Sequence, residues 1–378
     1  MPNKPNILIF IDWFLPGFKA GGPIKSVANI VNSLHADFNF YIITSDRDID
    51  DKVPYPTEEL NKWVKKENYY IAYLSSDNRK DFIIKTLKEN SFSKYYFNSL
   101  YSKQYTLEPL LFIKNKKNQS KIIIAPRGML GKGALKIKAL KKRLFIAFSN
   151  LIGFFNQITW HATDKEEKED IQGSFGKNFN IIVTPNISIL DIKEKELVKN
   201  KNELRLVFFS RIAEKKNLYY CLEILNNLKE YNITLDIYGS IEDEEYWRKC
   251  EDFILKNNLK VNYVSKLNPK DVQQTLSNYH FFFFPTLHEN YGHVIVEALS
   301  AGCGLILSDN TPWKGLYSHK IGWDINLNNP KEFIKVIEEC YKMNQEEYNE
   351  YRKNCYKYIK TETNKHNAIE LTKKMFSR

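Results

Sequence analysis

The chain lacks most of the features that mark membrane-spanning, secreted or metal-centred proteins. No apolar run approaches the roughly 18 residues that a membrane-spanning helix needs. The five cysteines are an odd number without metal-ligand spacing, which is typical of reduced thiols in the cytosol. The first apolar run, NILIFI, ends at Asp12 and predicts a strand rather than a signal peptide. We therefore expect a cytoplasmic protein.

Acidic residues are missing from one long segment. Between Pro109 and Thr163 there are eleven Lys and Arg residues and no Asp or Glu, in a chain of net charge +11. Such a segment favours phosphates, nucleic acid or an anionic membrane surface. A solvated, lysine-rich surface would have the same composition. No nucleic-acid-binding motif accompanies the charge, so we do not expect nucleic acid as a partner.

Strand and helix patterns alternate along the chain, on both sides of a polar passage from about Asn186 to Glu203. The length of 378 residues exceeds what one core usually supports, which predicts two domains. Apolar strands that alternate with helices predict parallel sheets covered on both faces. We predict an α/β protein with Rossmann-like domains at 1–186 and 187–355, whose sheets face each other across a cleft. The predicted strands are NILIFI, FYIIT, YYIAYL, KIIIAP, QITWHAT and NIIVTP, then LRLVFFS, ITLDIYG, KVNYV, HFFFFP and GLILS.

The loops that follow these strands are the expected ligand sites. After the first strand, Gly21 and Gly22 precede a helix that Pro23 opens, so backbone N–H groups could approach a phosphate. A plain turn is the alternative, and the G-x-G-x-x-G spacing of nicotinamide-binding proteins is absent. At 163–166, Thr-Asp-Lys-Glu is a capping-box pattern that predicts another helix start.

Two loops of the second half carry charged residues. Arg211 follows LRLVFFS, with Lys216 close behind, and two cations there could hold a diphosphate without metal. Glu289 follows HFFFFP, and Glu297 lies in the apolar helix that comes next. A carboxylate among apolar neighbours needs a partner, for which a pair of ligand hydroxyls would serve. The alternatives are surface cations, an acid favoured by the helix dipole, and a satisfied core carboxylate.

The stretch PTLHENYGHVIVEALSAGCGLILSD, at 285–309, resembles the E-x7-E signature of the retaining glycosyltransferase family 4, which has the GT-B fold. The resemblance covers almost the whole chain, and it implies that a C-terminal helix, 356–378, returns to the N-terminal domain. Five further matches follow in order: AGGPIKSV near the start, APRGML at 125–130, TPN at 184–186, SRIAEKKN at 210–217 and TPWKGL at 311–316.

The resemblance implies transfer of a hexosyl or N-acetylhexosaminyl group from a UDP-sugar, with retention of anomeric configuration and without metal or another cofactor. The acceptor would be a glycan or a polyprenyl-linked glycan in cell-surface polysaccharide assembly, such as that of lipopolysaccharide. Glu289, Arg211 and Lys216 would be the catalytic residues, with Glu289 on the donor sugar and the two cations on the departing diphosphate. The remaining donor-binding residues would be Gly21, Gly22, Asn290, Tyr291, Gly292, His293 and Glu297.

The chain departs from the family pattern at three places. ENYG replaces the common EGFG, and Asn217 replaces the usual glycine after the cations. Arg127 stands in the APRGML loop, where many relatives have a histidine, which puts a histidine-based acceptor contact in doubt. Arg127 is a candidate for binding acceptor or phosphate, and bracing the loop is its alternative role.

The segment 132–155 pairs a basic half with an apolar half, in the domain that binds acceptor in this family. It is a candidate for contact with an anionic membrane surface, which would place the enzyme on the inner face of the cytoplasmic membrane. A core helix whose lysines face water is the alternative. The cations in question are Lys136, Lys138, Lys141, Lys142 and Arg143.

Two other functions fit the predicted fold. A sugar-nucleotide epimerase shares it, and a non-catalytic protein that binds nucleotide sugars would need the same two domains. Turnover without an acceptor would indicate the epimerase, and saturable binding without turnover would indicate the binding protein.

Overall fold

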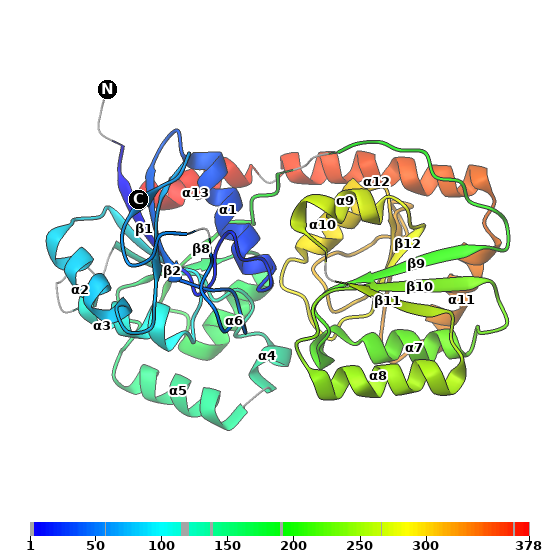
Figure 1. Cartoon of the computed structure of the whole chain (residues 1–378), viewed down its shortest axis with the longest axis horizontal. Helices are drawn as coiled ribbons and strands as arrows, with labels where there is room; N and C mark the ends of the chain where they lie inside the picture. The colour runs from blue at the N-terminus through cyan, green and yellow to red at the C-terminus, as the bar shows by residue number, and fades with distance from the viewer. Residues whose placement is uncertain are drawn as a thin grey trace. The chain divides into compact units, whose positions relative to one another are not determined.

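The computed structural model describes residues 4–56, 58–114, 121–136, 139–189, 192–265, 267–365 and 367–377. The chain forms two compact units. The first unit is Met1–Ser188 with His366–Arg378, and the second unit is Ile189–Lys365 (Figure 1). The sequence placed the first boundary at 186 and the start of the returning segment at 356. In the structure the helix α12 (Gln345–Lys365) continues to the end of the second unit, because neither Gly nor Pro interrupts it.

The first unit is built on an eight-stranded sheet of order β3-β4-β2-β1-β5-β6-β7-β8. Within the described residues its strand pairs are parallel, except that β3 runs antiparallel to β4. Its strands are β1 (Asn6–Phe10), β2 (Asn39–Ser45), β3 (Val64–Lys65), β4 (Tyr70–Leu74), β5 (Lys94–Phe97), β6 (Ile122–Ile124), β7 (Thr159–Ala162) and β8 (Asn180–Val183). Its helices are α1 (Gly22–Leu34), α2 (Arg79–Glu89), α3 (Glu108–Lys114), α4 (Lys132–Lys136), α5 (Ala139–Leu151), α6 (Lys165–Phe175) and α13 (Ala368–Ser377).

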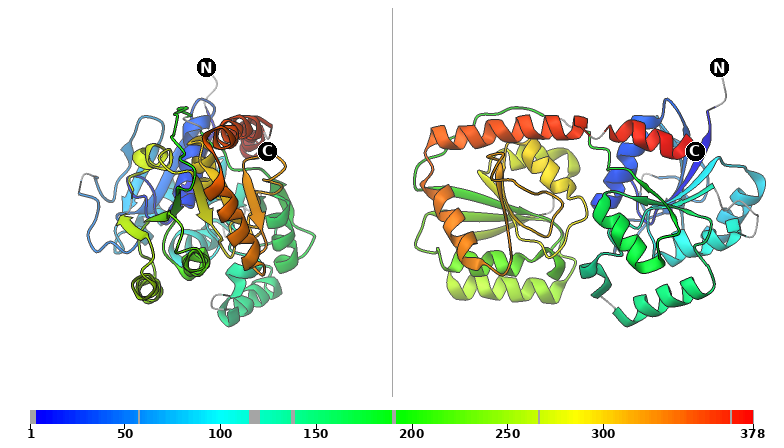
Figure 2. Two further views of the ribbon diagram at one scale, coloured as in Figure 1. Left: turned by 90° about the vertical axis from the view of Figure 1, so that its right-hand side faces the viewer. Right: turned by 180° about the vertical axis from the view of Figure 1, so that it is seen from behind.

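Both faces of this sheet are covered. Successive residues of a strand point to opposite faces, so Ile7 and Ile9 pack in the core beneath α1, whereas Leu8 and Phe10 pack in the core on the other side. The C-terminal helix α13 completes the α1 side, and Figure 2 shows it beside α1. The ring of Phe376 lies edge-on to three rings of this core, 5.7 Å from Phe38, 6.1 Å from Phe40 and 5.6 Å from Tyr96.

The second unit contains a six-stranded parallel sheet of order β11-β10-β9-β12-β13-β14. Figure 1 shows α7 and α8 on one face of this sheet and α9 and α10 on the other. Its strands are β9 (Leu204–Phe209), β10 (Ile233–Tyr238), β11 (Val261–Ser265), β12 (Phe281–Phe284), β13 (Gly304–Ser308) and β14 (Gly322–Ile325). Its helices are α7 (Leu218–Asn226), α8 (Glu244–Asn257), α9 (Val272–Leu276), α10 (His293–Ser300), α11 (Pro330–Lys342) and α12.

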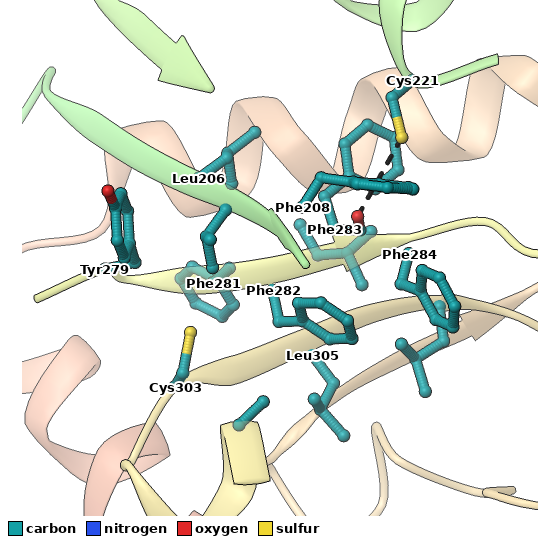
Figure 3. Packing of buried hydrophobic residues seen from close by; sticks show 14 of the residues in the cluster. Leu206, Phe208, Cys221, Tyr279, Phe281, Phe282, Phe283, Phe284, Cys303 and Leu305 are labelled. Carbon is teal, nitrogen blue, oxygen red and sulfur yellow. Dashed lines mark hydrogen bonds between the residues drawn. The ribbon is translucent and has the colours of Figure 1, made fainter. Parts of the chain in front are cut away.

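The strand β12 explains why four phenylalanines occur in a row. It lies between β9 and β13, so both of its faces are buried, and Phe281–Phe284 are fully inaccessible (Figure 3). Gly304 on β13 makes room for the first ring, since a Cβ at that position would lie 2.4 Å from Phe281. The sulfur of Cys221 on α7 packs 3.9 Å from the carbonyl oxygen of Phe283. All five cysteines are buried and free.

The strands predicted from apolar runs are all present, and the α/β prediction with a returning C-terminal helix is confirmed. Three strands of the sheets were not predicted, β3, β5 and β14. One helix start was placed a residue too early. The residue that caps α6 is Asp164, whose side chain accepts a 2.7 Å hydrogen bond from the backbone N–H of Glu167, and not Thr163.

Candidate active site

The strand order of the second unit identifies where a ligand should bind. The chain proceeds from β9 to β10 on one side of the sheet, whereas β12 pairs with β9 on its other side. Ligands of open α/β sheets bind at the carboxyl ends of the strands at such a switch point. The loop 210–217 follows β9, and the loop 285–292 follows β12. They are joined by hydrogen bonds of 3.0 Å from Leu287 N and 3.1 Å from Thr286 Oγ1 to the carbonyl oxygen of Lys215.

At this point a lysine and a glutamate meet. Lys216 Nζ donates to Glu289 Oε2 at 2.5 Å, and the side chains are only 14% and 17% exposed. Lys216 Nζ also lies 5.4 Å from the ring centre of buried Phe284. Burial alone would raise the pKa of Glu289, but the Lys216 ammonium, helped by Lys215 and His288, outweighs burial and lowers this pKa below its ordinary value. The pair therefore supplies an ionised carboxylate and a cation near one another.

Two residues with positive φ shape the loops around this pair. Asn217 has φ 60° and donates from Nδ2 to Pro285 O at 2.9 Å, which links the two loops. Asn is among the few residues that adopt this conformation readily, which explains how Asn217 can stand where the resembled pattern has a glycine. Gly292 has φ 76° at the start of α10. A Cβ there would lie 2.7 Å from Ile295 Cδ1 and 3.1 Å from Glu289 Cγ. Glycine is therefore the residue type that fits at position 292 without strain, which explains the Tyr-Gly pair beside Glu289.

The remaining predicted residues of this loop lie next to the pair. The backbone N–H of Glu289 donates to Asn310 O at 3.0 Å, and Trp313 Nε1 donates to Tyr291 O at 2.7 Å. His293 is the first residue of α10, buried, with its ring 4.9 Å from that of Tyr291. Glu297 lies within α10 and is partly exposed rather than enclosed in the core. The loop is therefore held by hydrogen bonds to its backbone, and the side chains of Glu289 and Glu297 remain partly exposed.

Arg211 does not join the Lys216–Glu289 pair. Its NH1 donates to Glu242 Oε2 at 2.6 Å, and both side chains are more than a third exposed. Exposed ion pairs of this kind contribute little to stability, so Arg211 could exchange Glu242 for a ligand at small cost. The structure thus places both predicted cations after β9, and each forms an ion pair with a different carboxylate.

Gly21, Gly22 and Arg127 belong to the first unit. Gly21 precedes α1 with φ 68°, and Gly22 is the first residue of the helix. Arg127 donates from Nε to Asn98 Oδ1 at 2.8 Å, from NH1 to Asn186 Oδ1 at 2.5 Å and from NH2 to Tyr96 OH at 2.7 Å. All three guanidinium nitrogens are engaged by the protein, and this geometry favours the bracing role.

A buried network continues from Arg127. The Tyr96 hydroxyl lies 2.8 Å from His161 Nδ1, and His161 Nε2 lies 2.9 Å from Thr184 O. The carbonyl can only accept, so Nε2 carries the proton and Nδ1 accepts from Tyr96. Burial, with the charge of Arg127, lowers the pKa of His161 to about 3. Below Arg127, the carboxylate of Glu167 accepts from Gly128 N at 2.6 Å and from Thr163 N at 2.7 Å.

Asp12 is a further candidate residue, which the sequence patterns did not indicate. It follows β1, and the switch point of the first sheet lies between β1 and β5. Ser102, which comes after β5, donates to Asp12 Oδ1 at 2.6 Å. Burial raises the pKa of Asp12, against the opposing effects of Ser102 and Arg79. The available signal was the abrupt end of NILIFI at an acid, because a carboxylate directly after a buried strand lies at the sheet edge where ligands bind.

Metal binding and membrane crossing each require a recognisable arrangement of residues. Within the described residues, no group of three or more His, Cys, Asp or Glu side chains is arranged to hold a metal ion. None of the helices that these residues form combines the length and the apolar character that crossing a bilayer demands.

Known proteins resemble this chain both in sequence and in fold. Residues 191–361, most of the second unit, match the family model described as "Glycosyl transferases group 1". Over 99% of the chain and 100% of the other, the structure is similar to that of Anabaena HepE in complex with UDP-glucose, with a TM-score of 0.72 and 12% identity. The fold is GT-B.

Two further GT-B enzymes have similar structures. WaaG, a glycosyltransferase involved in lipopolysaccharide biosynthesis, matches with a TM-score of 0.64 and 13% identity over 98% of each chain. The lipopolysaccharide outer core galactosyltransferase WaaB matches with a TM-score of 0.60 and 16% identity over 96% of this chain and 99% of the other. Comparison with curated protein sequences finds no match. At these identities the structures establish the GT-B fold of the chain.

Proposed function

We propose that this protein is a retaining glycosyltransferase of family 4 that uses a UDP-sugar as donor. The observation that carries the proposal is the Lys216–Glu289 pair at the switch point of the second unit, within the residues that match the glycosyl transferase family. The structure of HepE in complex with UDP-glucose supports the choice of nucleotide. The sugar transferred would be a hexosyl or an N-acetylhexosaminyl group.

The two cations act on the leaving group in this proposal. When the bond between the anomeric carbon and the diphosphate oxygen breaks, the electron pair stays on the diphosphate and its negative charge rises. Lys216 and Arg211 lie in the loop after β9, where Arg211 could exchange Glu242 for a phosphate oxygen and Lys216 could contact another while it holds Glu289. Fixed cations that meet developing charge stabilise a transition state without metal, and backbone N–H groups at the start of α10 would add to them.

The two glutamates act on different parts of the donor. Glu289, ionised and oriented by Lys216, accepts hydrogen bonds from hydroxyls of the donor sugar. Glu297, one turn further into α10 and partly exposed, accepts from the nucleotide ribose. The backbone turn between the two glutamates is formed by Asn290, Tyr291, Gly292 and His293. Gly21 and Gly22, at the start of α1 in the first unit, are the other donor-binding residues of this proposal.

The acceptor in this proposal binds to the first unit, with Asp12 accepting from one of its hydroxyls. Arg127 acts indirectly, by bracing the loop 125–130. The acceptor is a glycan or a polyprenyl-linked glycan of cell-surface polysaccharide assembly, and the enzyme works in the cytoplasm, in contact with the membrane through 132–155. WaaG and WaaB, which act in lipopolysaccharide assembly, share the fold and support this choice of pathway class.

A thermal-shift screen of nucleotide sugars tests the donor, since a ligand that binds the native state raises the melting temperature. We expect stabilisation by UDP and by one UDP-sugar, followed by UDP release only when a glycan or polyprenyl-linked acceptor is added. NMR of the product should show the anomeric configuration of the donor, and EDTA should leave the rate unchanged. A product formed without acceptor would indicate an epimerase, and saturable binding without any product would indicate a binding protein.

A further inference from the structure

The helix α5 exposes an apolar face. Of the large hydrophobic side chains that are exposed in the described residues, five lie on this helix or directly after it. They recur at the spacing of one helix face, so they form a single stripe. The exposed fractions are 72% for Leu140, 61% for Leu144, 61% for Phe148, 83% for Leu151 and 53% for Ile152.

The opposite face of α5 anchors the helix to the first unit. Lys142 turns inward, where Nζ donates to Ala134 O at 2.6 Å and lies 5.3 Å from the ring centre of Tyr101. Phe145 packs edge-on against Tyr101 at 5.5 Å, and Ser149 is buried. The expected core helix with solvated lysines is therefore not what forms. One predicted surface lysine faces the protein, and the apolar side chains face outward.

Cations flank the stripe on both sides. At 100° per residue, Lys141 lies about 60° from Leu144 on one side and Arg143 about 100° from it on the other, and both are exposed. Neither forms an ion pair within the described part of the chain, and the segment from Pro109 to Thr163 contains no acid. Lys138 lies outside the described residues. An apolar stripe bordered by cations is complementary to a layer with an apolar interior and an anionic surface.

We propose that α5 inserts its apolar face into the interface of an anionic lipid bilayer, with Lys141 and Arg143 among the headgroups. An amphipathic helix of this kind lies parallel to the membrane, with its apolar side chains about 5–10 Å deep. The inference rests on the proposed function only for the reason that a membrane is there, namely a lipid-linked acceptor. It differs from adhesion by charge alone, because insertion of Leu144 and Phe148 resists salt, whereas cation–headgroup attraction does not.

Flotation with vesicles of phosphatidylglycerol and phosphatidylcholine tests the insertion directly. We expect the unmodified protein to bind at about 0.1 M salt and to keep a measurable part of that binding at about 1 M, where the Debye length falls from about 10 Å to about 3 Å. Leu144→Ser with Phe148→Ser should weaken binding at least about a hundredfold. Lys141→Gln with Arg143→Gln should weaken it roughly thirtyfold, at low salt only.

A matched control removes equal apolar surface elsewhere. Val53→Ser with Leu255→Ser changes two side chains that are 71% and 73% exposed outside α5, and vesicle binding should not change. Depth is measured with an environment-sensitive dye on Leu151→Cys, since the five natural cysteines are buried. Vesicles should shift its emission to the blue, and brominated lipid should quench it.

Three results would overturn the inference. The first is no vesicle binding at low salt, and the second is binding that high salt abolishes but that Leu144→Ser with Phe148→Ser leaves unchanged. The third is a dimer of the unmodified protein that becomes a monomer in this double variant. The last would show that a second copy covers α5. The melting temperature with UDP is measured on the same samples. Retained UDP binding without vesicle binding contradicts the insertion alone, and vesicle binding without a response to any nucleotide sugar contradicts the proposed function alone.

Discussion

Lys216 and Glu289 form a 2.5 Å ion pair although 73 residues separate them in the sequence. They meet because β9 and β12, the strands before their loops, are neighbours in the sheet. The sequence assigned one to the diphosphate and the other to the donor sugar. Since each holds the other in the structure, removing either should change the properties of its partner as well as its own contact with the donor.

Replacing either predicted cation by Ala should weaken UDP binding and slow transfer at least tenfold, since a charge-assisted hydrogen bond contributes about 1.5–3 kcal/mol. Lys216→Ala should also raise the pKa of Glu289, because burial then acts without the lysine. In the unmodified protein the lowered pKa keeps Glu289 ionised, and this contribution to stability is lost only as the pH falls through that lowered value. Calorimetry with UDP and an NMR titration of the carboxylate measure the two effects.

The control for this prediction is Lys335→Ala, which removes a lysine that is 77% exposed on α11. Its UDP affinity and its transfer rate should equal those of the unmodified protein. Unchanged kinetics in Lys216→Ala and Arg211→Ala together would remove both cations from the site.

The two glutamates should separate kinetically. Glu289→Gln should chiefly lower kcat, because the donor sugar loses a contact at the reacting centre. Glu297→Gln should chiefly weaken nucleotide binding, since its partner is the ribose. Steady-state kinetics and calorimetry with UDP distinguish the two, and normal binding and transfer in both variants would refute the assignment of this motif.

Arg127 should prove to be a structural residue. Arg127→Met removes three hydrogen bonds, to Asn98, Asn186 and Tyr96, and should lower the free energy of unfolding of the first unit by about 3 kcal/mol. UDP affinity should not change. A raised KM for acceptor at an unchanged melting temperature would instead show that Arg127 contacts the acceptor.

Mild acid should destabilise both units through buried histidines. Burial lowers the pKa of His161 in the first unit to about 3 and that of His280 in the second to about 4. Both stay neutral in the folded protein but bind a proton in the unfolded chain below about 6.5, so stability falls as the pH falls. Below about pH 6.5, each histidine should lower the free energy of unfolding by about 1.4 kcal/mol per pH unit.

Urea unfolding at about pH 7.5 and about pH 5 measures this slope. His161→Gln should reduce the slope for the first unit and leave the second unit's unchanged, because it removes one titrating group from one core. An equal slope in the variant and the unmodified protein would show that other groups govern the acid response.

Local sequence patterns were sufficient to predict most of the strands. A strand that is buried on both faces appears in the sequence as an apolar run, and this run can be recognised without knowing which strands it pairs with. The strands β5 and β14 were missed for a physical reason. KYYF of β5 is four residues long within a polar passage, and its pairing with β1 and β6 makes it a strand. GWDI of β14 contains Asp324, whose carboxylate accepts from Gly315 N at 3.1 Å and Leu316 N at 2.9 Å instead of entering the core.

The site was predictable as a list of residues but not as an arrangement. Spacing and position after strands selected Lys216, Arg211 and Glu289, yet their pairing depends on the strand order, which no local pattern states. Arg127 remained ambiguous because its three partners come from 96, 98 and 186. The exposed stripe of α5 was hidden for the same reason, since a helical pattern does not reveal which face packs.

The helix α13 also determines when the first unit can be finished. It carries Met375 and Phe376, which belong to the core beneath β1 and β2, and it follows the entire second unit in the sequence. During translation the segment up to Ser188 emerges first, with this part of its core still uncovered. Domains generally fold as units during synthesis, so we expect the first unit to complete its core around Phe38 only after α13 has been made.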